Sequence, residues 1–319
     1  MTRLRKGKTS AAVKPKKHSG ISKQEQIELM LIMLPTLILI FIFCYIPLYG
    51  ILIAFQDYVP GMPIISFDGS TRWVGFKHFV DFITSRTFPR LLRNTLVLSG
   101  LNLLFGFTTP IIFALLLNEV KAAQYKKVVQ TASYLPYFIS TVIVAGMVLS
   151  FIDTNGIINA VRKMMGYAPK AFNMDPEAFP YIYTITNVWK RFGWDSILYL
   201  SAMSSIDMNL YEAARLDGAT RGQQMWHITL ASIKPTIVML LIFAIGGVLG
   251  TNTDLILLLY NPAVYDTADV IGTYVYRDSL LGGRFSFGTA VGLFTSALNF
   301  TLTFIANAVS RKVADYSLW

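Results

Sequence analysis

The sequence predicts an all-α protein that crosses a membrane several times. Of its 319 residues, 54% are hydrophobic and only 14% are charged, whereas about a quarter of the residues in soluble globular chains are charged. The charges are clustered, and the apolar stretches between the clusters reach the ~20 residues that a helix needs to cross the hydrocarbon core of a bilayer. These observations favour a polytopic membrane protein over a soluble one.

Six segments predict membrane-spanning helices, because each stays largely apolar over about 20 residues. Several contain or adjoin a proline, which membrane helices tolerate where neighbouring helices satisfy the freed backbone groups. The fourth is unusual, since Lys190, Arg191 and Asp195 lie near its middle. The predicted spans are residues 28–55, 93–119, 127–153, 180–206, 234–252 and 284–311.

The basic residues indicate how these spans are oriented. With the N-terminus inside, the segments that face the cytoplasm hold 16 Lys and Arg and the outer segments hold 10. Lys and Arg concentrate on the cytoplasmic side of membrane proteins, so we expect both termini in the cytoplasm. The basic N-terminus is then a topology signal rather than an arm that binds nucleic acid.

The order of these segments predicts four parts. The first apolar run is too long for the hydrophobic region of a cleaved signal peptide, so it is expected to be a retained membrane anchor. We expect a basic cytoplasmic tail at 1–26, the first span with an external amphipathic segment at 27–92, a transmembrane core at 93–310 and a cytoplasmic C-terminal tail at 311–319.

The external segment contains a short predicted helix. Phe76, Phe79, Val80 and Ile83 recur at helical spacing, with Phe82 at the edge of the same stripe. This pattern is typical of an amphipathic helix that lies at the membrane surface or along the flank of the protein. Because the residue before a proline avoids helical geometry, the helix is expected to end at Pro89.

The stretch "LYEAARLDGATRGQQMWHITL", residues 210–230, is polar although it separates two predicted spans. Gly218 lies where a glycine commonly ends a helix. Thr220, with Gln223 three residues later, forms a candidate capping box for a second helix. The predicted result is a cytoplasmic elbow of helix, glycine turn and helix, hereafter the elbow (residues 207–230).

The elbow resembles the EAA loop of ATP-binding-cassette (ABC) import permeases. The match consists of Glu212-Ala213-Ala214, Gly218, Ile228 and Leu230, with Asp217 beside the glycine. The family commonly has proline where this chain has Ala231, which places the start of the fifth span in question. "YIPLYGILIAFQDY", "SYLPYFIS", "LLLYNPAVYDTADVIGTYVYRDSL" and the final "SLW" resemble the sugar-importing branch, within it polysaccharide and oligosaccharide permeases, including alginate importers.

The resemblance implies a fold and partners. The fold would be the six-helix type I importer fold in a bacterial inner membrane, and the elbow would be the coupling helix that docks on an ATPase subunit. The chain has no G-x-x-x-x-G-K-[ST] loop that would cradle a nucleotide phosphate. ATP and Mg are therefore expected on two separate ATPase subunits, beside a second permease subunit in a heterodimer and an extracytoplasmic solute-binding protein.

The sequence suggests no chemistry of its own. No nucleophile, metal-ligand or paired-carboxylate pattern appears, the single cysteine, Cys44, lies in the first apolar run, and the three histidines are far apart. The chain is therefore not expected to be an enzyme or to hold a metal.

The fourth and fifth spans hold the candidate substrate pathway. The resemblance to maltose-importing permeases implies that Asn187, Trp194 and Asn252 contact the sugar. Lys190 and Arg191 lie at mid-span, where a charge costs about 2.5–3.5 kcal/mol unless it faces a cavity or a partner, and Asp254 follows Asn252. Arginine pairs with carboxylates, so Arg191 suggests an acidic, alginate-like uronate glycan.

Alternatives remain for these residues. Arg191 and Asp195 are four apart and pair on one helix face, or the helix breaks near Gly193. The substrate could be a neutral oligosaccharide, and Asp195 or Asp254 could serve an ion-driven secondary transporter instead. A membrane enzyme acting on lipid-linked sugars would need an acidic or metal-binding cluster, which the sequence lacks. Tyr134, Tyr137, Tyr181 and Tyr183 fit an interfacial aromatic belt or a surface on which a sugar stacks.

Overall fold

The computed structural model describes residues 22–66, 69, 71–314 and 316–319, so most of the predicted basic tail lies outside the described residues. Over the described residues the chain is helical, with one isolated β-bridge between Gln56 and Trp73. Its contacts divide it into two units, residues 1–50 and 51–319. The prediction of an all-α chain is confirmed.

The first unit holds most of one long helix. Ser22 and Glu25 form a capping box at its start, and Pro35 lies inside α1 without ending it. None of the side chains from Lys23 to Tyr45 is buried in the unit. A helix that is apolar all round and unburied within its own chain suits a bilayer. The elements are α1 (Lys23–Ile40), η1 (Phe41–Tyr45) and η2 (Ile46–Phe55), the last of which continues into the second unit.

Five helical segments are long and apolar enough to cross a membrane among the residues that the structure describes. Four of them overlap predicted spans one, two, five and six, and one starts inside predicted span three. They are Lys23–Phe55, Phe88–Asn118, Thr141–Met164, Arg221–Gly246 and Phe285–Val313. The second consists of α3 (Phe88–Leu101), η3 (Asn102–Gly106) and α4 (Phe107–Asn118), and the last is α15 (Phe285–Val313).

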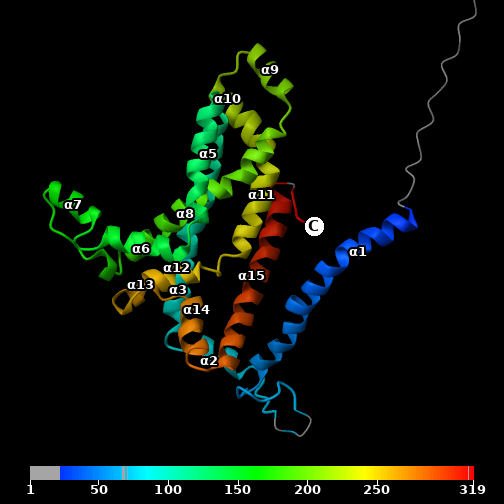
Figure 1. Ribbon diagram of the computed structural model, residues 1–319, viewed down its shortest axis with the longest axis vertical. Coiled ribbons are helices and arrows are strands. Elements are labelled where there is room, and N and C mark those ends of the chain that lie inside the picture. Colours follow the sequence, from blue (N-terminus) through cyan, green and yellow to red (C-terminus); the bar gives the residue numbers. More distant parts are fainter. Residues whose placement is uncertain (1–21, 67–68, 70, 315) are drawn as a thin grey trace, which may run out of the picture. The chain divides into compact units, whose positions relative to one another are not determined.

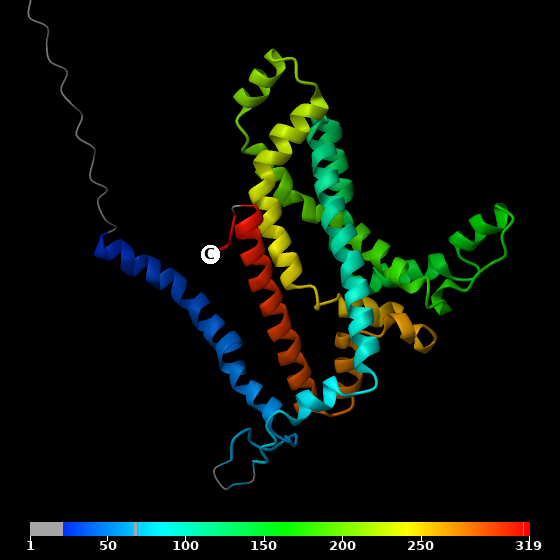
Figure 2. The ribbon, with the colours of Figure 1, turned by 180° about the vertical axis from the view of Figure 1, so that it is seen from behind.

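The prediction of a single third span is wrong, because two helices replace it. The backbone is extended at Ile139 and Ser140, and the carbonyl of Ser140 accepts a hydrogen bond from Val144, which starts a new helix. Figures 1 and 2 show the second helix and the one after it leading away to one side. The three are α5 (Ala123–Phe138), α6 (Thr141–Ile152) and α7 (Ile157–Met164).

The fourth predicted span is one continuous helix, α8 (Phe179–Ser204). The alternative in which it breaks near Gly193 is therefore wrong. Gly193 instead lies against α5, where a Cβ atom would come within 2.1 Å of the Ser133 carbonyl oxygen. With Lys190, Arg191 and Asp195 inside it, α8 is not among the five segments that are apolar enough to span by composition alone.

The fifth span starts earlier than predicted. A helix begins after Thr220 and runs without interruption to Gly246, with Pro235 inside it. Ala231 lies within this continuous helix, so the cytoplasmic helix and the span merge. The prediction that the span extends to about Asn252 is also wrong, because the helix ends at Gly246. Its parts are α10 (Arg221–Gln224), η5 (Met225–Thr229) and α11 (Leu230–Gly246), preceded by α9 (Met208–Leu216).

The predicted external helix is present as α2 (Lys77–Ile83), and its apolar residues lie in two environments. Phe82 is fully buried among the aromatic rings of α3 and α15, whereas Phe76, Val80 and Ile83 are exposed. Pro89 does not end this helix, because a turn at residues 84–87 separates it from α3, where Pro89 lies in the first turn.

The second unit packs as layers of helices. α8 packs on α4, α5 and α11, while α15 packs on α11 and α2. Figures 1 and 2 show α9 at one end of this unit and α2 at the other. The segment between α11 and α15 contains only short helices: α12 (Thr253–Leu259), η6 (Pro262–Val264), α13 (Tyr265–Ala268), α14 (Ile271–Tyr274) and η7 (Val275–Leu280); η4 (Phe172–Met174) precedes α8.

Candidate functional site

A cavity of about 540 Å³ lies between α3–η3–α4, α8 and α11 with the loop that follows it. Three of the residues predicted for the substrate pathway line it: Asn187, Arg191 and Asn252. Asn187 and Arg191 are four apart and share one face of α8, while Asn252 caps the start of α12. Residues from separate helices thus meet at one cavity.

Three asparagines connect the walls of the cavity. The Asn252 side-chain amide donates to the Asn187 carbonyl oxygen at 3.1 Å, and the Asn187 amide donates to the Asn102 oxygen at 2.7 Å. The backbone N–H of Asn252 donates to the Tyr183 hydroxyl at 3.0 Å. This chain of amides, hereafter the asparagine ladder (Asn102, Asn187 and Asn252), presents donors and acceptors suited to hydroxyl groups.

Asn102 is a site residue that the sequence reading missed. It begins η3, a π-helical turn within an otherwise α-helical segment, and such turns often mark functional positions. Its side chain lies beside Gly106, where a Cβ atom would come within 3.2 Å of the Asn102 oxygen. A lone asparagine in the apolar run "SGLNLLFGF" was the available signal.

Arg191 lines the cavity but is already paired. Its Nε and Nη2 donate to the two Asp195 oxygens at 3.2 and 3.3 Å. The interpretation of these residues as an ion pair one helical turn apart is therefore confirmed. Because both members line the cavity, they contribute polar groups to its wall with no net charge between them.

The other three predicted pathway residues lie outside the cavity lining. The Lys190 ammonium donates to the Thr141 hydroxyl at 2.7 Å, at the start of α6. Trp194 stacks on Tyr137, with ring centroids 4.5 Å apart and planes only 3° from parallel. Asp254 is exposed in the first turn of α12.

The predicted tyrosines have separate environments. Tyr183 is buried and accepts the hydrogen bond from Asn252, so the interpretation as an exposed belt residue is wrong for it. Tyr137 contacts Trp194, and Tyr181 is exposed. Tyr134, like Tyr137, is half-buried on α5, so the four residues do not share one environment.

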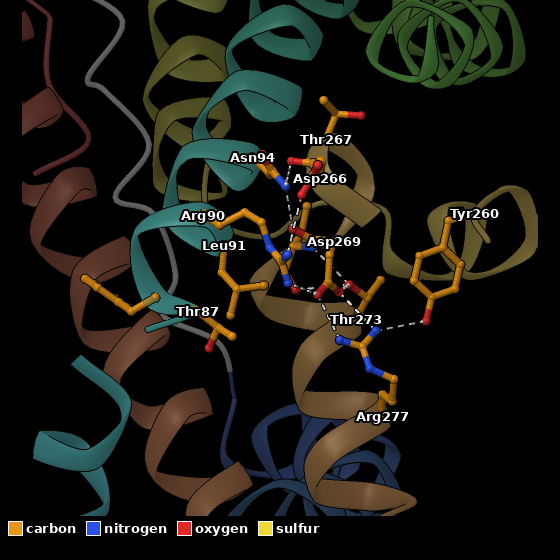
Figure 3. Close-up of polar contacts among 12 residues, drawn as sticks. Thr87, Arg90, Leu91, Asn94, Tyr260, Asp266, Thr267, Asp269, Thr273 and Arg277 are labelled. Atoms are coloured by element: carbon orange, nitrogen blue, oxygen red, sulfur yellow. Dashed lines mark hydrogen bonds and ion pairs between the residues drawn. The ribbon is translucent and has the colours of Figure 1, made fainter. Parts of the chain in front are cut away.

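A second polar cluster holds the segment of short helices against α3 (Figure 3). The Asp269 side chain is 0% exposed and accepts hydrogen bonds from the Arg277 guanidinium at 2.8 and 3.1 Å and from the Thr273 hydroxyl at 2.9 Å. Arg90 of α3 approaches the same carboxylate at 3.6 Å. The hydrogen bonds that Arg277 donates to Asp269 raise the pKa of Arg277, so its charge is retained.

Asn94 completes this cluster from α3. Its side-chain amide donates to the backbone carbonyls of Asp266 and Asp269, both at 2.9 Å. Arg90 and Asp269 lie far apart in sequence, and no local pattern predicted their contact. Since the buried carboxylate is paired and hydrogen-bonded on several sides, the cluster fastens the residues between α12 and η7 to α3.

The elbow has the predicted local geometry. Gly218 adopts a φ of 81°, its N–H donates to the Arg215 carbonyl, and the N–H of Ala219 donates to Ala214. These two bonds form a Schellman motif that ends α9. Thr220 and Gln223 form the predicted capping box.

The elbow residues divide into exposed and inward-facing groups. Glu212, Ala213, Asp217 and Gly218 are exposed and Ala214 is half-buried. Leu216, at the tip, is 90% exposed. Ile228 and Leu230 are half-buried, and Leu230 packs on the cluster that joins α4, α8 and α11, which anchors the elbow to the helices. The Tyr211 hydroxyl lies 2.8 Å from the Thr229 hydroxyl and links the two arms.

Comparison with known proteins adds independent information. A family model described as "Binding-protein-dependent transport system inner membrane component" matches residues 106–315. The polygalacturonan/rhamnogalacturonan transport system permease protein YteP of Bacillus subtilis (strain 168) is 43% identical over 92% of this chain and 91% of that relative.

Two solved structures are also similar. One chain belongs to the crystal structure of a bacterial ABC transporter involved in the import of the acidic polysaccharide alginate, with a TM-score of 0.82 and 44% identity over 91% of this chain and 97% of that one. The other belongs to a bacterial alginate ABC transporter in complex with an alginate pentasaccharide-bound periplasmic protein, with a TM-score of 0.83 and 42% identity over 92% of this chain and 98% of that one.

Proposed function

Because the chain belongs to the family of binding-protein-dependent transport system inner membrane components, we propose that it imports acidic oligosaccharides or polysaccharides by alternating access. It is the membrane-spanning permease subunit of an ATP-driven importer. The observation that carries the substrate class is a cavity of about 540 Å³, lined by the asparagine ladder and the Arg191–Asp195 pair among apolar residues. The chain is 44% identical to a chain of an importer of the acidic polysaccharide alginate.

Asn187 and Asn252 of the asparagine ladder contact sugar hydroxyls in this proposal. Each has an amide that can exchange a bond within the ladder for one to a hydroxyl, at little net cost. The Arg191–Asp195 pair forms a polar wall of the same cavity. Lys190, Trp194 and Asp254 belong to the wider pathway outside it.

A neutral oligosaccharide is the second candidate, and a specific observation favours it. The ionised side chains that line the cavity, Arg191 and Asp195, neutralise each other. Amides and a paired arginine suit hydroxyl groups as well as they suit carboxylates, so the transport assay must compare acidic and neutral glycans.

The elbow is the part that receives force from an ATPase subunit. Glu212, Ala213, Ala214, Asp217 and Gly218 lie on its outer arm, and Leu216 offers an exposed apolar side chain at its tip. Leu230 carries the movement to α4, α8 and α11 through the packed cluster, and Ile228 lies half-buried in the same arm. ATP and Mg bind to two partner ATPase subunits. The complex also contains a second permease subunit and a solute-binding protein.

We propose six spans, with α8 as the one whose charges face the pathway and with both termini in the cytoplasm. Single cysteines at Asp217 and Asp266, two exposed positions, test this topology in a Cys44→Ala background. Membrane-impermeant maleimide should label position 217 only from the cytoplasmic side and position 266 only from outside. Labelling of both from one side contradicts the topology.

The direct test of function is copurification followed by an ATPase assay. The chain should copurify with an ATPase and a second permease when its genomic neighbours are expressed with it. Hydrolysis should rise when the solute-binding protein is added with an oligogalacturonate or oligoalginate, and less with a neutral glucan of equal length. Stimulation by the neutral glucan alone would support the second candidate.

A further inference from the structure

Lys190 lacks a carboxylate partner. It lies near the middle of α8, and among the described residues no Asp or Glu oxygen approaches its ammonium within 4 Å. Its ammonium donates a hydrogen bond to the neutral hydroxyl of Thr141 at 2.7 Å. A lysine at this depth is costly unless it faces water or an anion, so its surroundings are not lipid.

Arg191, the neighbouring cation, differs from Lys190 in this respect. Its Nε and Nη2 donate to Asp195, so the charge of Arg191 is already balanced. A substrate carboxylate could accept from the remaining N–H groups of Arg191, but it would share a cation whose charge Asp195 already balances, and Asp195 would repel it. At Lys190 it would meet an ammonium that can donate two more hydrogen bonds. Lys190 is therefore better suited than Arg191 to bind the carboxylate of an acidic sugar.

Aromatic rings lie beside Lys190. Trp194 is one helical turn further along the same face of α8, stacks on Tyr137 and remains 38% exposed. Phe138 meets the Trp194 ring edge-on at 5.4 Å, which fixes its orientation. An aromatic face attracts the slightly positive C–H groups on the apolar side of a sugar ring.

This group adjoins the cavity. Asn187 and Arg191, which line the cavity, flank Lys190 in the turns of α8. The break at Ile139–Ser140 places Tyr137 and Phe138 on one side of it and Thr141 on the other, all against this flank of α8. The α5–α6 connection thus places aromatic rings and the Thr141 hydroxyl against the turns of α8 that carry Lys190 and Trp194, next to residues that line the cavity.

We propose that Lys190, Trp194 and Tyr137 form a uronate subsite at the flank of the cavity. Lys190 binds the carboxylate of one acidic sugar ring, and Trp194, held by Tyr137, supports the apolar face of that ring. The asparagine ladder binds the hydroxyls of a neighbouring ring. This subsite rests on the proposed function and specifies which residue distinguishes acidic from neutral glycans.

The test uses the complete transporter, with its partner subunits and solute-binding protein, in proteoliposomes. Uptake of trigalacturonate and of its methyl ester is measured for the unmodified protein and for Lys190→Met and Lys190→Arg. Removing the carboxylate's charged hydrogen bond should lower the apparent affinity for trigalacturonate by about ten- to a hundredfold in Lys190→Met. Uptake of the ester should change less than about threefold, and Lys190→Arg should keep most of the preference for the acid.

Thr141→Val is the matched control, because it removes the hydroxyl and leaves the ammonium. If Lys190 only pins α6 to α8, Thr141→Val and Lys190→Met lower uptake of both compounds equally, and the proposal is overturned. Membrane abundance of each variant separates such a folding loss from a change in selectivity. If the unmodified transporter takes up neither compound, the proposed substrate class fails and the subsite with it. Uptake of both compounds with no selective loss in Lys190→Met refutes the subsite alone.

Discussion

Replacing Gly193 by alanine should separate α5 from α8. A Cβ atom at Gly193 would lie 2.1 Å from the carbonyl oxygen of Ser133 and 2.5 Å from its carbonyl carbon. These are backbone atoms, which no rotamer change can move away. To restore an ordinary contact the helices must part by roughly 1 Å, and overpacking of this kind costs about 1–3 kcal/mol.

The displacement should also affect the neighbouring aromatic pair. Tyr137 lies one helical turn after Ser133, and Trp194 follows Gly193 directly, so the two stacked rings move apart with their helices. We expect Gly193→Ala to unfold several degrees lower than the unmodified protein in a detergent thermal melt, and to show altered tryptophan fluorescence.

Gly146→Ala is the matched control. Gly146 lies within α6, and a Cβ atom there would meet nothing within 4 Å. Alanine is favoured over glycine inside a helix by about 1 kcal/mol, so this variant should be as stable as the unmodified protein or slightly more stable. If Gly193→Ala melts together with Gly146→Ala, the close approach of α5 and α8 described above is incorrect.

Three further substitutions test other parts of the structure. Gly218→Ala places a side chain at a φ of 81°, at a cost of about 1–2 kcal/mol, and should weaken copurification of the ATPase, whereas Gly222→Ala in the same elbow should not. Asp269→Asn leaves two arginines without their buried carboxylate and should cost about 3 kcal/mol, seen as a lower melting temperature; an unchanged melt would refute the fastening role of this cluster. The hydrogen bond from Lys170 lowers the pKa of Asp175 below its ordinary 3.8, so its stabilising effect is present above pH 3.8 and is lost as the pH falls through the lowered pKa. Protease resistance of residues 165–178 should follow this curve in the unmodified protein and be reduced already at neutral pH in Asp175→Asn.

The sequence correctly predicted structural features that are set by residues close together in the chain. The capping box of Thr220 and Gln223 and the glycine at 218 each specify backbone geometry within a few positions, and the structure has both. The long apolar runs predicted four spans correctly in outline, because burying a helix in lipid depends on composition rather than on particular contacts.

Features that depend on distant partners were not predicted. Asn102 becomes a site residue only when α8 brings Asn187 to it, and Asp269 is paired by Arg90 from another helix. The environments of the apolar residues of α2 also depend on distant partners. Rings from α3 and α15 bury Phe82, whereas Phe76, Val80 and Ile83 stay exposed, because an apolar side chain in a membrane protein need not face the protein.

The break between α5 and α6 did have a local signal. Ser140 and Thr141 are residues that favour helix starts over helix interiors. The apolar run on both sides of them concealed that signal, since a count of apolar residues across 127–153 does not distinguish one helix from two.

Accumulation of substrate in proteoliposomes shows whether this chain forms an ATP-driven pathway for an acidic glycan. The complete transporter would be reconstituted with ATP inside, on the ATPase side, and with the solute-binding protein and labelled trigalacturonate outside. We predict that the vesicles accumulate trigalacturonate above its external concentration, and that omitting either ATP or the binding protein abolishes this accumulation. Equal uptake without ATP, or accumulation driven by an ion gradient alone, would contradict the claim.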